Sequence, residues 1–252
     1  MNKQPVALIT GVSSGVGYAT TLKFLSENIY VAGTARRAER LEQLQQHNKN
    51  FLPIIADVRD TSAMQAAVDQ TIEQFGRLDL LIANAGLGHR GSIIESNWQD
   101  IKTLLDTNID GVLHSVRAAV PRMQDGGQVI LISSIAARMI TPYAGFYAAS
   151  KAFISSLGRA LRLELESRHI AVTDVLLGRV QTEFNEKRLG QPGRGGSFPP
   201  AMPVENAANA IFRAYQKRPK QVVVRWVDRL MLWGNIIIPE WIGRKAMKQY
   251  KG

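Results

Sequence analysis

Short apolar runs alternate with longer amphipathic stretches along most of this chain. Each run is apolar at consecutive positions, which is typical of parallel strands that are buried on both faces. The stretches between the runs have the length and the apolar periodicity of helices. The runs cover residues 6–9, 29–32, 52–55, 80–83, 129–132 and 172–176, and the expected helices cover 18–28, 61–75, 98–124 and 146–168.

A repeated strand–helix–strand order predicts an α/β fold with a doubly wound parallel sheet of the Rossmann type. Right-handed crossover connections bring the carboxyl ends of the strands to one edge of the sheet. Ligands bind at that edge, so the residues that follow each run are the first candidates for a functional site. A further apolar run at residues 221–226 is expected to add a last strand.

The chain has 252 residues, and we expect a single Rossmann-fold domain over residues 1–252, although two small domains also fit this length. Residues 184–203 are rich in glycine and proline, which predicts a flexible loop beside the substrate. Too little chain follows this loop to build a second domain. Residues 222–252 form a C-terminal segment that is both apolar and basic.

The composition excludes several kinds of site. The chain has no cysteine, which excludes disulfides, thiolate catalysis and cysteine-bound zinc. No secretory leader is visible, and no apolar run reaches the ~20 residues that a bilayer-spanning helix needs, so we expect a cytoplasmic protein. The histidines lack metal-ligand spacing and are expected at surface or helix positions without a metal. They are His47, His89, His114 and His169.

The formal charge of +10 is compatible with nucleic acid, an anionic membrane or an acidic ligand as a partner. The basic residues are scattered, which indicates a solvated basic surface and no nucleic-acid site. They become denser toward the C-terminus, at Arg225, Arg229, Arg244, Lys245, Lys248 and Lys251.

The first run leads directly into a glycine motif that opens the first helix. Gly11 permits a tight turn, Gly15 lets backbone approach a pyrophosphate, and Gly17 lets the helix pack closely on the strand. The N–H groups of the helix N-terminus then favour bound phosphate. A glycine turn can also be purely structural, but its position directly after the first strand favours a dinucleotide site. The motif reads Thr10-Gly11-Val12-Ser13-Ser14-Gly15-Val16-Gly17.

The residues after the second run indicate which dinucleotide is bound. An NAD site carries an acidic residue there for the ribose hydroxyls, but this chain has Arg36 and Arg37 and no carboxylate before Glu39. A guanidinium pairs with a 2′-phosphate, whereas a carboxylate repels it. Arg36, helped by Ser13, therefore favours NADP(H), and Arg37 is the weaker candidate. The alternative is that both arginines cap a surface loop.

Tyr147 and Lys151 lie four residues apart at the start of an expected helix, so both side chains share one helix face. A phenol has a pKa of ~10, and a neighbouring ammonium together with an oxidised nicotinamide is expected to lower that pKa. Tyr147 can then exchange a proton with a substrate oxygen. Such a pair on its own is more often structural, and its weight comes from the residues that accompany it.

Polar residues at other strand ends complete the candidate site. Ser134 follows the fifth run, where its hydroxyl can bind and orient a substrate oxygen. Asn108 lies inside an expected long helix, for which asparagine has poor propensity, and it can hold a water that links Lys151 to solvent. Asp57 and Val58 follow the third run, where the carboxylate can accept from an adenine amino group and the valine can cover the ring. Asp57 fits an ordinary helix cap equally well.

In order and spacing, these motifs resemble the short-chain dehydrogenases/reductases over roughly residues 5 to 185. The resemblance implies a nicotinamide-dependent oxidoreductase in which Tyr147 is the acid/base and Lys151 holds the nicotinamide ribose. It implies that Ser134 binds the reacting oxygen and that Asn108 completes a proton relay. It also implies a dimer or tetramer joined through the helices that contain Asn108 and Tyr147. The matching motifs are the glycine loop, Asn84-Ala85-Gly86, Ser134 and Tyr147-x-x-x-Lys151.

The resemblance adds further cofactor contacts and one departure. By it, Asn84, Ala85 and Gly86 support the sheet and line the adenosine ribose, while Val180 and Thr182 contact the nicotinamide carboxamide. The family often has Pro-Gly after the sixth strand, whereas this chain has Leu177-Gly178 followed by Arg179. Without the proline, a looser turn is expected. The expected cofactor-binding set is Gly11, Ser13, Ser14, Gly15, Val16, Gly17, Arg36, Arg37, Asp57, Val58, Asn84, Ala85, Gly86, Tyr147, Lys151, Val180 and Thr182.

The substrate is expected to be a small molecule with a bulky, apolar, lipid-, steroid- or retinoid-like body, because the variable segments at 89–94, 138–146 and 184–202 contain large apolar and aromatic residues. A 3-oxoacyl-thioester reductase and a non-catalytic NADPH-binding regulator are the alternatives, and an intact Tyr-Lys-Ser-Asn set argues against the latter. The C-terminal segment has two interpretations. It is either a helix packed on this domain or a second subunit, or an amphipathic element in peripheral contact with a membrane.

Overall fold

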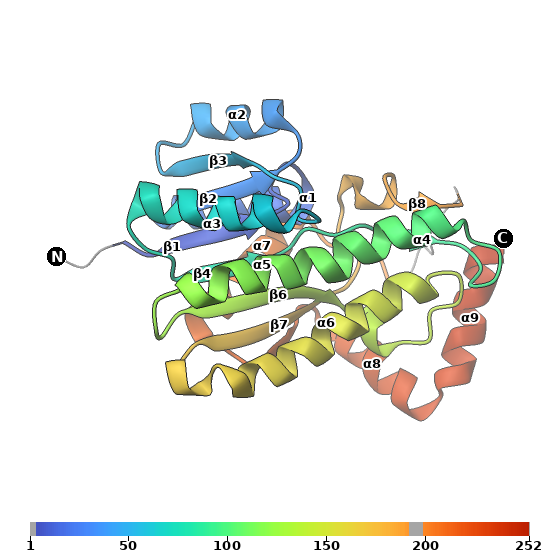
Figure 1. Cartoon of the computed structure of the whole chain (residues 1–252). Coiled ribbons are helices and arrows are strands. Elements are labelled where there is room, and N and C mark those ends of the chain that lie inside the picture. Colours follow the sequence, from blue (N-terminus) through green and yellow to red (C-terminus); the bar gives the residue numbers. More distant parts are fainter. Residues whose placement is uncertain (1–3, 192–198, 252) are drawn as a thin grey trace.

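A central parallel sheet with helices on both faces builds the protein (Figure 1). The computed structural model describes residues 4–191 and 199–251. The sheet has seven strands in the order β3-β2-β1-β4-β6-β7-β9, and all neighbouring strands are parallel. The strands are β1 (Val6–Thr10), β2 (Tyr30–Ala35), β3 (Phe51–Ile55), β4 (Leu80–Ala83), β6 (Gln128–Ser134), β7 (Ala171–Leu177) and β9 (Gln221–Val223).

The strand order reverses direction at β1, which confirms the doubly wound Rossmann-type fold that the alternating pattern predicts. β1, β4 and β6 are buried along their whole length, which explains why their apolar residues stand at consecutive rather than alternate positions. Fully burying a side chain such as Leu81 or Ile130 stabilises the fold by about 1.5–3 kcal/mol.

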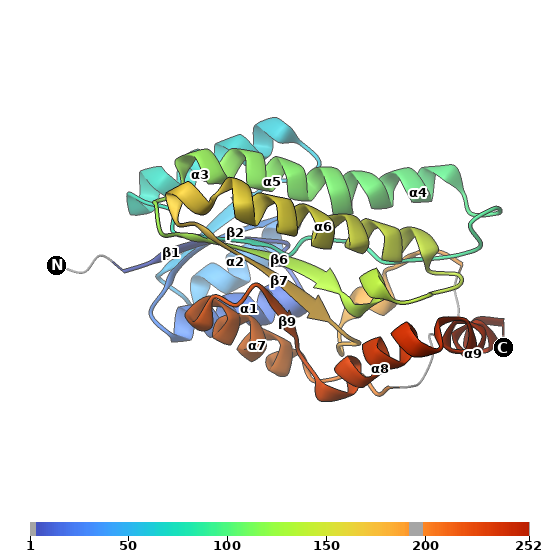
Figure 2. The ribbon, with the colours of Figure 1, turned by 90° about the horizontal axis from the view of Figure 1, so that it is seen from below.

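Two apolar clusters fill the spaces between the sheet and its two helical layers. One contains residues of α1, α2 and α7, where the ring of Phe24 meets the ring of Phe212 edge-on at 5.2 Å. The other contains residues of α3, α5 and α6. Figure 2 shows the two layers above and below the sheet. Their helices are α1 (Gly15–Ser26), α2 (Ala38–Gln46), α3 (Thr61–Phe75), α4 (Trp98–Leu105), α5 (Gly111–Ala119), α6 (Gly145–Glu164) and α7 (Val204–Lys217).

The long helix expected over residues 98–124 is interrupted. A π-helical turn, Asp106–Asp110, separates α4 from α5, and a short 3-10 turn, Val120–Arg122, follows α5. Such π-turns widen the helix by one residue and are frequent at functional sites. The turn contains Asn108, a residue type with poor propensity for an α-helix. Further 3-10 turns are Ile135–Arg138, Glu166–Arg168 and Glu183–Asn185.

The segment expected as a loop at 184–203 contains some regular structure in its described part. Residues 192–198 lie outside the described residues. Before them, β8 (Leu189–Gly190) pairs with β5 (His89–Arg90) in a small two-stranded sheet. After them, Met202 forms a parallel bridge with Val180. Backbone pairing therefore connects both described ends of the segment to the rest of the domain.

The C-terminal segment folds as two helices, α8 (Trp226–Ile237) and α9 (Pro239–Lys251), which follow the edge strand β9. They lie beside the carboxyl end of the sheet, away from the two main helical layers (Figures 1 and 2). Among the helices of residues 4–191 and 199–251, none combines the length and the apolar character that crossing a bilayer requires.

Candidate active site

A cavity of about 1080 Å³ opens at the carboxyl edge of the sheet. Pockets for a single small molecule span about 300–1,000 Å³, so this cavity has room for a dinucleotide together with a substrate. Every residue that the sequence proposes for cofactor contact lines it, as do Ser134, Tyr147 and Lys151. Asn108 is buried behind the wall and does not line it.

The glycine motif forms the floor of the cavity where α1 begins. Gly11 and Gly15 have positive φ angles of 74° and 56°, which L side chains rarely adopt. At Gly17 a Cβ atom would lie 2.3 Å from the carbonyl oxygen of Gly11, so only glycine allows this approach of helix and strand end. The loop therefore presents backbone and the α1 N-terminus to the cavity, a donor set that fits a pyrophosphate.

Asn84 and Thr10 connect the ends of the two central strands β4 and β1. The Asn84 side chain donates to the carbonyl oxygen of Thr10 at 2.8 Å. In return, the Thr10 hydroxyl accepts from the backbone N–H groups of Asn84 and Ala85, each at 3.0 Å. These bonds fix the glycine motif relative to Asn84-Ala85-Gly86, so that both segments line one cavity.

The two arginines after β2 contact different partners. Arg37 donates from Nη2 to the Ser13 hydroxyl at 3.0 Å and to the Ser13 carbonyl oxygen at 3.2 Å. Arg36 instead lies 3.7 Å from a carboxylate oxygen of Asp57 and is mostly exposed. In this structure Ser13 therefore contacts Arg37, and the selection of the cofactor by Arg36 and Ser13 stays a prediction. Successive side chains at a strand end point in opposite directions, which brings Arg37 rather than Arg36 over the glycine loop.

Asp57 is already engaged by a neighbouring cation. Arg59 donates from Nε to both carboxylate oxygens, at 3.1 and 3.0 Å, and from Nη2 at 2.6 Å. These bonds hold the pKa of Asp57 below its usual value. The carboxylate lines the cavity as an anion and keeps lone pairs for a further donor. Val58 is buried and packs against the π-turn side of α5 at Gly111.

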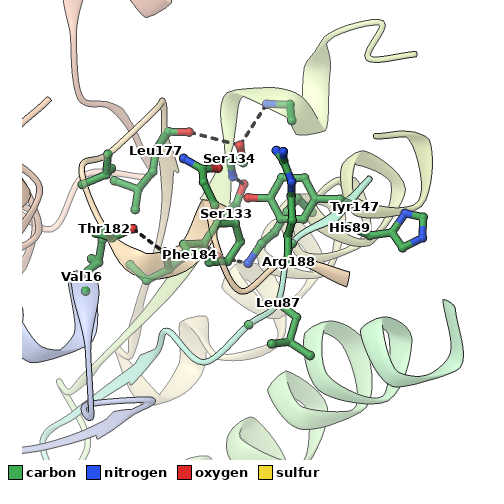
Figure 3. A pocket seen from close by; sticks show the side chains of 18 of the residues that line it. Val16, Leu87, His89, Ser133, Ser134, Tyr147, Leu177, Thr182, Phe184 and Arg188 are labelled. Atoms are coloured by element: carbon green, nitrogen blue, oxygen red, sulfur yellow. Dashed lines mark hydrogen bonds between the residues drawn. The ribbon is translucent and has the colours of Figure 1, made fainter. Parts of the chain in front are cut away.

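Ser134, Tyr147 and Lys151 meet at the inner end of the cavity, with Ser134 from the end of β6 and the other two from the first turns of α6. Figure 3 shows the Tyr147 hydroxyl turned toward Ser134. Ser134 Oγ also donates to the carbonyl oxygen of Leu177 at 3.2 Å. Two hydroxyl groups thus converge on one point of the cavity, where they can bind one substrate oxygen.

Burial shifts the pKa values of both Tyr147 and Lys151 in the cofactor-free protein. Removal of the phenol from bulk water raises the pKa of Tyr147, and the hydrogen bond with Ser134 only partly opposes this. Burial lowers the pKa of Lys151 to about 8, although Asp174 acts in the opposite direction. The ammonium donates to the Ile132 carbonyl oxygen at 2.9 Å. The expected lowering of the Tyr147 pKa involves a bound, oxidised nicotinamide and stays a prediction for the cofactor complex.

Asn108 lies behind Lys151 and joins three segments. Its Nδ2 donates to the Leu87 carbonyl oxygen at 2.9 Å and to the Ser150 hydroxyl at 3.0 Å, and its Oδ1 accepts from the Leu87 backbone N–H at 2.7 Å. Both Asn108 Oδ1 and Lys151 Nζ lie within 3.3 Å of the place that a Cβ on Gly86 would occupy. The π-turn therefore places the Asn108 amide against α6 and against the end of the Asn84-Ala85-Gly86 segment.

The turn after β7 has a support that the sequence did not reveal. Arg225 and Asp228, at the start of α8, form an ion pair at 2.6 Å, and Asp228 is fully buried. A Cβ on Gly178 would lie 2.3 Å from Asp228 Oδ2. The chain lacks the proline that the family often has before this glycine, and the Arg225–Asp228 ion pair packs against Gly178. Beyond it, Val180 and Thr182 line the cavity, and Thr182 lies against Gly15.

His89 is not the surface histidine that the sequence suggested. It lies in β5, is buried, and meets the ring of Phe146 edge-on at 5.7 Å. Neither of its ring nitrogens has a hydrogen-bond partner among the described residues, and burial lowers the pKa of His89. The ring is turned away from the Tyr147 hydroxyl (Figure 3). The signal available in the sequence was its place in a segment expected to form the substrate pocket.

The family described as short chain dehydrogenase matches residues 5–192. The chain is 34% identical over 186 residues to a 3-ketodihydrosphingosine reductase of Bacteroides thetaiotaomicron, a match that covers 73% of this chain and 66% of that protein. It is also 34% identical to a serine 3-dehydrogenase of Agrobacterium fabrum, with 88% of this chain and 91% of that protein covered.

A solved short-chain dehydrogenase/reductase from Serratia marcescens superposes with a TM-score of 0.77 at 29% identity, covering 89% of this chain and 98% of that one. The match in sequence, the fold and the converging Ser134, Tyr147 and Lys151 side chains agree with one another. The chain belongs to the short-chain dehydrogenase/reductase family, whose members are oxidoreductases that interconvert alcohol and carbonyl groups with NAD(H) or NADP(H).

Proposed function

We propose that this protein is an NADP(H)-dependent oxidoreductase that interconverts a carbonyl and an alcohol on a bulky apolar substrate. In this proposal Tyr147, Ser134, Lys151 and Asn108 carry the chemistry. The observation that carries the proposal is the convergence of the Tyr147 and Ser134 hydroxyls in a cavity that also contains the glycine loop and two arginines.

In the reductive direction Tyr147 acts as the proton donor. The nicotinamide, when bound, supplies hydride to the carbonyl carbon. The Tyr147 phenol gives its proton to the substrate oxygen as negative charge develops there, and the Ser134 hydroxyl donates a hydrogen bond to the same oxygen. Burial raises the pKa of Tyr147, so the phenol is protonated at neutral pH and holds the proton that it donates. The reverse sequence oxidises the alcohol.

Lys151 and Asn108 support this transfer from behind. An ammonium next to the phenol stabilises the phenolate left after proton donation, and the same group would hold the nicotinamide ribose when the cofactor is bound. Asn108 is a positioning residue in this proposal, because its amide groups bond Leu87 and Ser150. By fixing the start of α6, it holds Lys151 in register with Tyr147 and completes the route along which a water returns the proton.

The preference for NADP(H) rests on the two arginines at the end of β2. Arg37 is held over the glycine loop by Ser13, and Arg36 lies on the other side of the strand end. Both guanidinium groups line the cavity. Their present partners, Glu183 and Asp57, each lie 3.7 Å away. Such loose pairs are exchanged readily for a bidentate bond to a ribose 2′-phosphate.

The substrate end of the cavity supports a bulky apolar ligand. Its walls include large apolar side chains from four separate segments, which suits a ligand with an extended hydrocarbon body. One relative's name specifies a sphingoid substrate and another's specifies serine, so relatives alone do not select a substrate. A 3-oxoacyl thioester is the second candidate. The walls contain Met139, Ile140, Phe184, Met231, Trp241 and Ile242.

A homo-oligomer, dimer or tetramer, is part of the proposal. The helices expected to join the subunits carry large exposed apolar side chains, Trp98 on α4 and Phe153 and Leu163 on α6. Such patches on a single chain mark interaction surfaces. Sedimentation of the purified protein tests this element separately from the chemistry.

The enzyme class is tested by following oxidation of NADPH and of NADH across ketones and aldehydes graded from short and polar to long and apolar. The proposal predicts turnover with NADPH preferred and with rates that rise with apolar length. Turnover confined to short polar carbonyls would contradict the substrate class. Tight NADPH binding without any turnover would favour a non-catalytic regulator.

A further inference from the structure

Helix α8 has its apolar side chains on the outside. Trp226, Leu230, Trp233 and Ile237 recur at the spacing of one helix face and are 73%, 58%, 67% and 74% exposed. A helix of a globular protein normally turns such a stripe toward the core. Exposed contiguous apolar surface of this kind marks a site of interaction. Ile236, Ile238 and Trp241 extend the stripe toward α9.

The opposite face of α8 is held to the domain by polar contacts. Asp228 is fully buried, and its ion-pair partner Arg225 donates from Nη1 to the Pro200 carbonyl oxygen at 2.6 Å. Asn235 donates to the Arg138 carbonyl oxygen at 2.9 Å and accepts from the Ile140 backbone N–H at 3.2 Å. A buried ion pair and a two-point amide contact define one rotation of the helix about its axis. These contacts therefore fix the outward orientation of the apolar stripe.

Positive charge surrounds the stripe. Arg229 on α8 and Arg244, Lys245 and Lys248 on α9 are all exposed. The acidic side chains of the two helices are already paired, Asp228 with Arg225 and Glu240 with Arg244 at 3.1 Å. Exposed tryptophans and aliphatic residues flanked by lysine and arginine are the pattern of a helix that lies in the interface of an anionic bilayer.

We propose that α8 and the start of α9 form a docking face for an anionic lipid bilayer. The helix axis of α8 lies in the membrane plane, with its apolar stripe at the acyl boundary and the basic side chains at the phosphate level. A second copy of this chain is the weaker occupant, because a two-fold contact would place the same cationic residues opposite one another.

The inner side of this docking face is a wall of the cavity. Met231 of α8 and Trp241, Ile242 and Lys245 of α9 line the same space as the catalytic hydroxyls. Figures 1 and 2 show the two helices beside the carboxyl end of the sheet, where the cavity opens. Docking would therefore turn the substrate end toward the bilayer. This consequence rests on the proposed function, whereas membrane binding itself does not.

The test is sedimentation of the full chain with phosphatidylcholine vesicles, with and without phosphatidylglycerol. The wild-type chain is expected to bind the anionic vesicles, and to bind less as salt rises. The double variant Trp233→Glu/Ile237→Glu is expected to lose about tenfold or more in partitioning, because two inserted apolar side chains become charged. Arg244→Gln/Lys248→Gln should reduce binding to anionic vesicles only.

Ile55→Glu is the matched control, because Ile55 is 68% exposed on β3 at the opposite edge of the sheet. It should leave vesicle binding unchanged. None of the altered side chains lines the cavity, so turnover of a short water-soluble carbonyl should stay at the wild-type rate in all variants. That readout separates failure of docking from failure of the enzymatic proposal.

Three results would overturn the docking face. The first is absence of vesicle binding by the wild-type chain. The second is equal binding by the wild type and Trp233→Glu/Ile237→Glu. The third is a wild-type oligomer in analytical ultracentrifugation that dissociates in this double variant, without lipid binding, which would assign the stripe to a second copy.

Discussion

Arg37 lies over the glycine loop with its Nη2 atom 3.0 Å from the hydroxyl oxygen of Ser13. This bond links the end of β2 to the loop that begins α1, the two segments between which the adenosine end of a dinucleotide lies in this fold. The guanidinium is thus fixed before any ligand arrives, and a fixed cation loses less entropy when it binds a phosphate.

The first prediction concerns the choice of cofactor. Replacing Arg37 by alanine should reduce the ratio of kcat/KM for NADPH to that for NADH about tenfold or more, since charge-assisted bonds contribute about 1.5–3 kcal/mol. Arg36→Ala should reduce it less, because Arg36 is mostly exposed and lies across the strand end. Steady-state kinetics with both cofactors measure the ratio. A ratio unchanged in both variants would mean that another group selects the cofactor.

The second prediction concerns pH and stability of the cofactor-free protein. Folding lowers the pKa of Lys151 from 10.5 to about 8, so the unfolded chain binds more protons than the folded one between these values. Stability contributed by this residue therefore rises with pH across the window, and the buried ammonium costs stability below about pH 8. Denaturant titrations of the wild type and Lys151→Met should show their difference changing in favour of the wild type between about pH 8 and 10. A constant difference would contradict the lowered pKa.

The third prediction concerns the turn after β7. Asp228→Ala leaves Arg225 without its partner against Gly178, and breaking a buried ion pair costs about 3–5 kcal/mol. Because Val180 and Thr182 follow this turn, the KM for the cofactor should rise as well. Glu240→Ala, which removes an exposed pair with Arg244, is the control and should leave both quantities unchanged. Wild-type stability in Asp228→Ala would show that the pair does not support the turn.

The parts of the site that the sequence predicts correctly are those set by backbone geometry. The glycine motif, the polar residues at strand ends and the runs that became β1, β2, β3, β4, β6, β7 and β9 follow from local rules of strand burial and connection handedness. The prediction of a single helix over residues 98–124 missed the π-turn at Asn108. This turn depends on bonds to Leu87 and Ser150, which lie far away in sequence.

Local sequence patterns do not predict which side chains from distant parts of the chain contact one another. Which of Arg36 and Arg37 meets Ser13 depends on the exit angle of β2. The Arg225–Asp228 pair against Gly178 requires α8 to return to the turn after β7. A sequence reveals the residue types in each case, but their contacts form only when the tertiary fold brings them together.

The measurement that tests the account most directly is a comparison of Tyr147→Phe with the wild type. The variant keeps the ring and loses only the hydroxyl that faces Ser134. NADPH binding, followed by nicotinamide fluorescence, should remain at the wild-type level, while kcat for carbonyl reduction should fall about 10²–10⁴-fold, the contribution of a positioned general acid. Turnover at the wild-type rate would remove Tyr147 from the acid/base role and contradict the account.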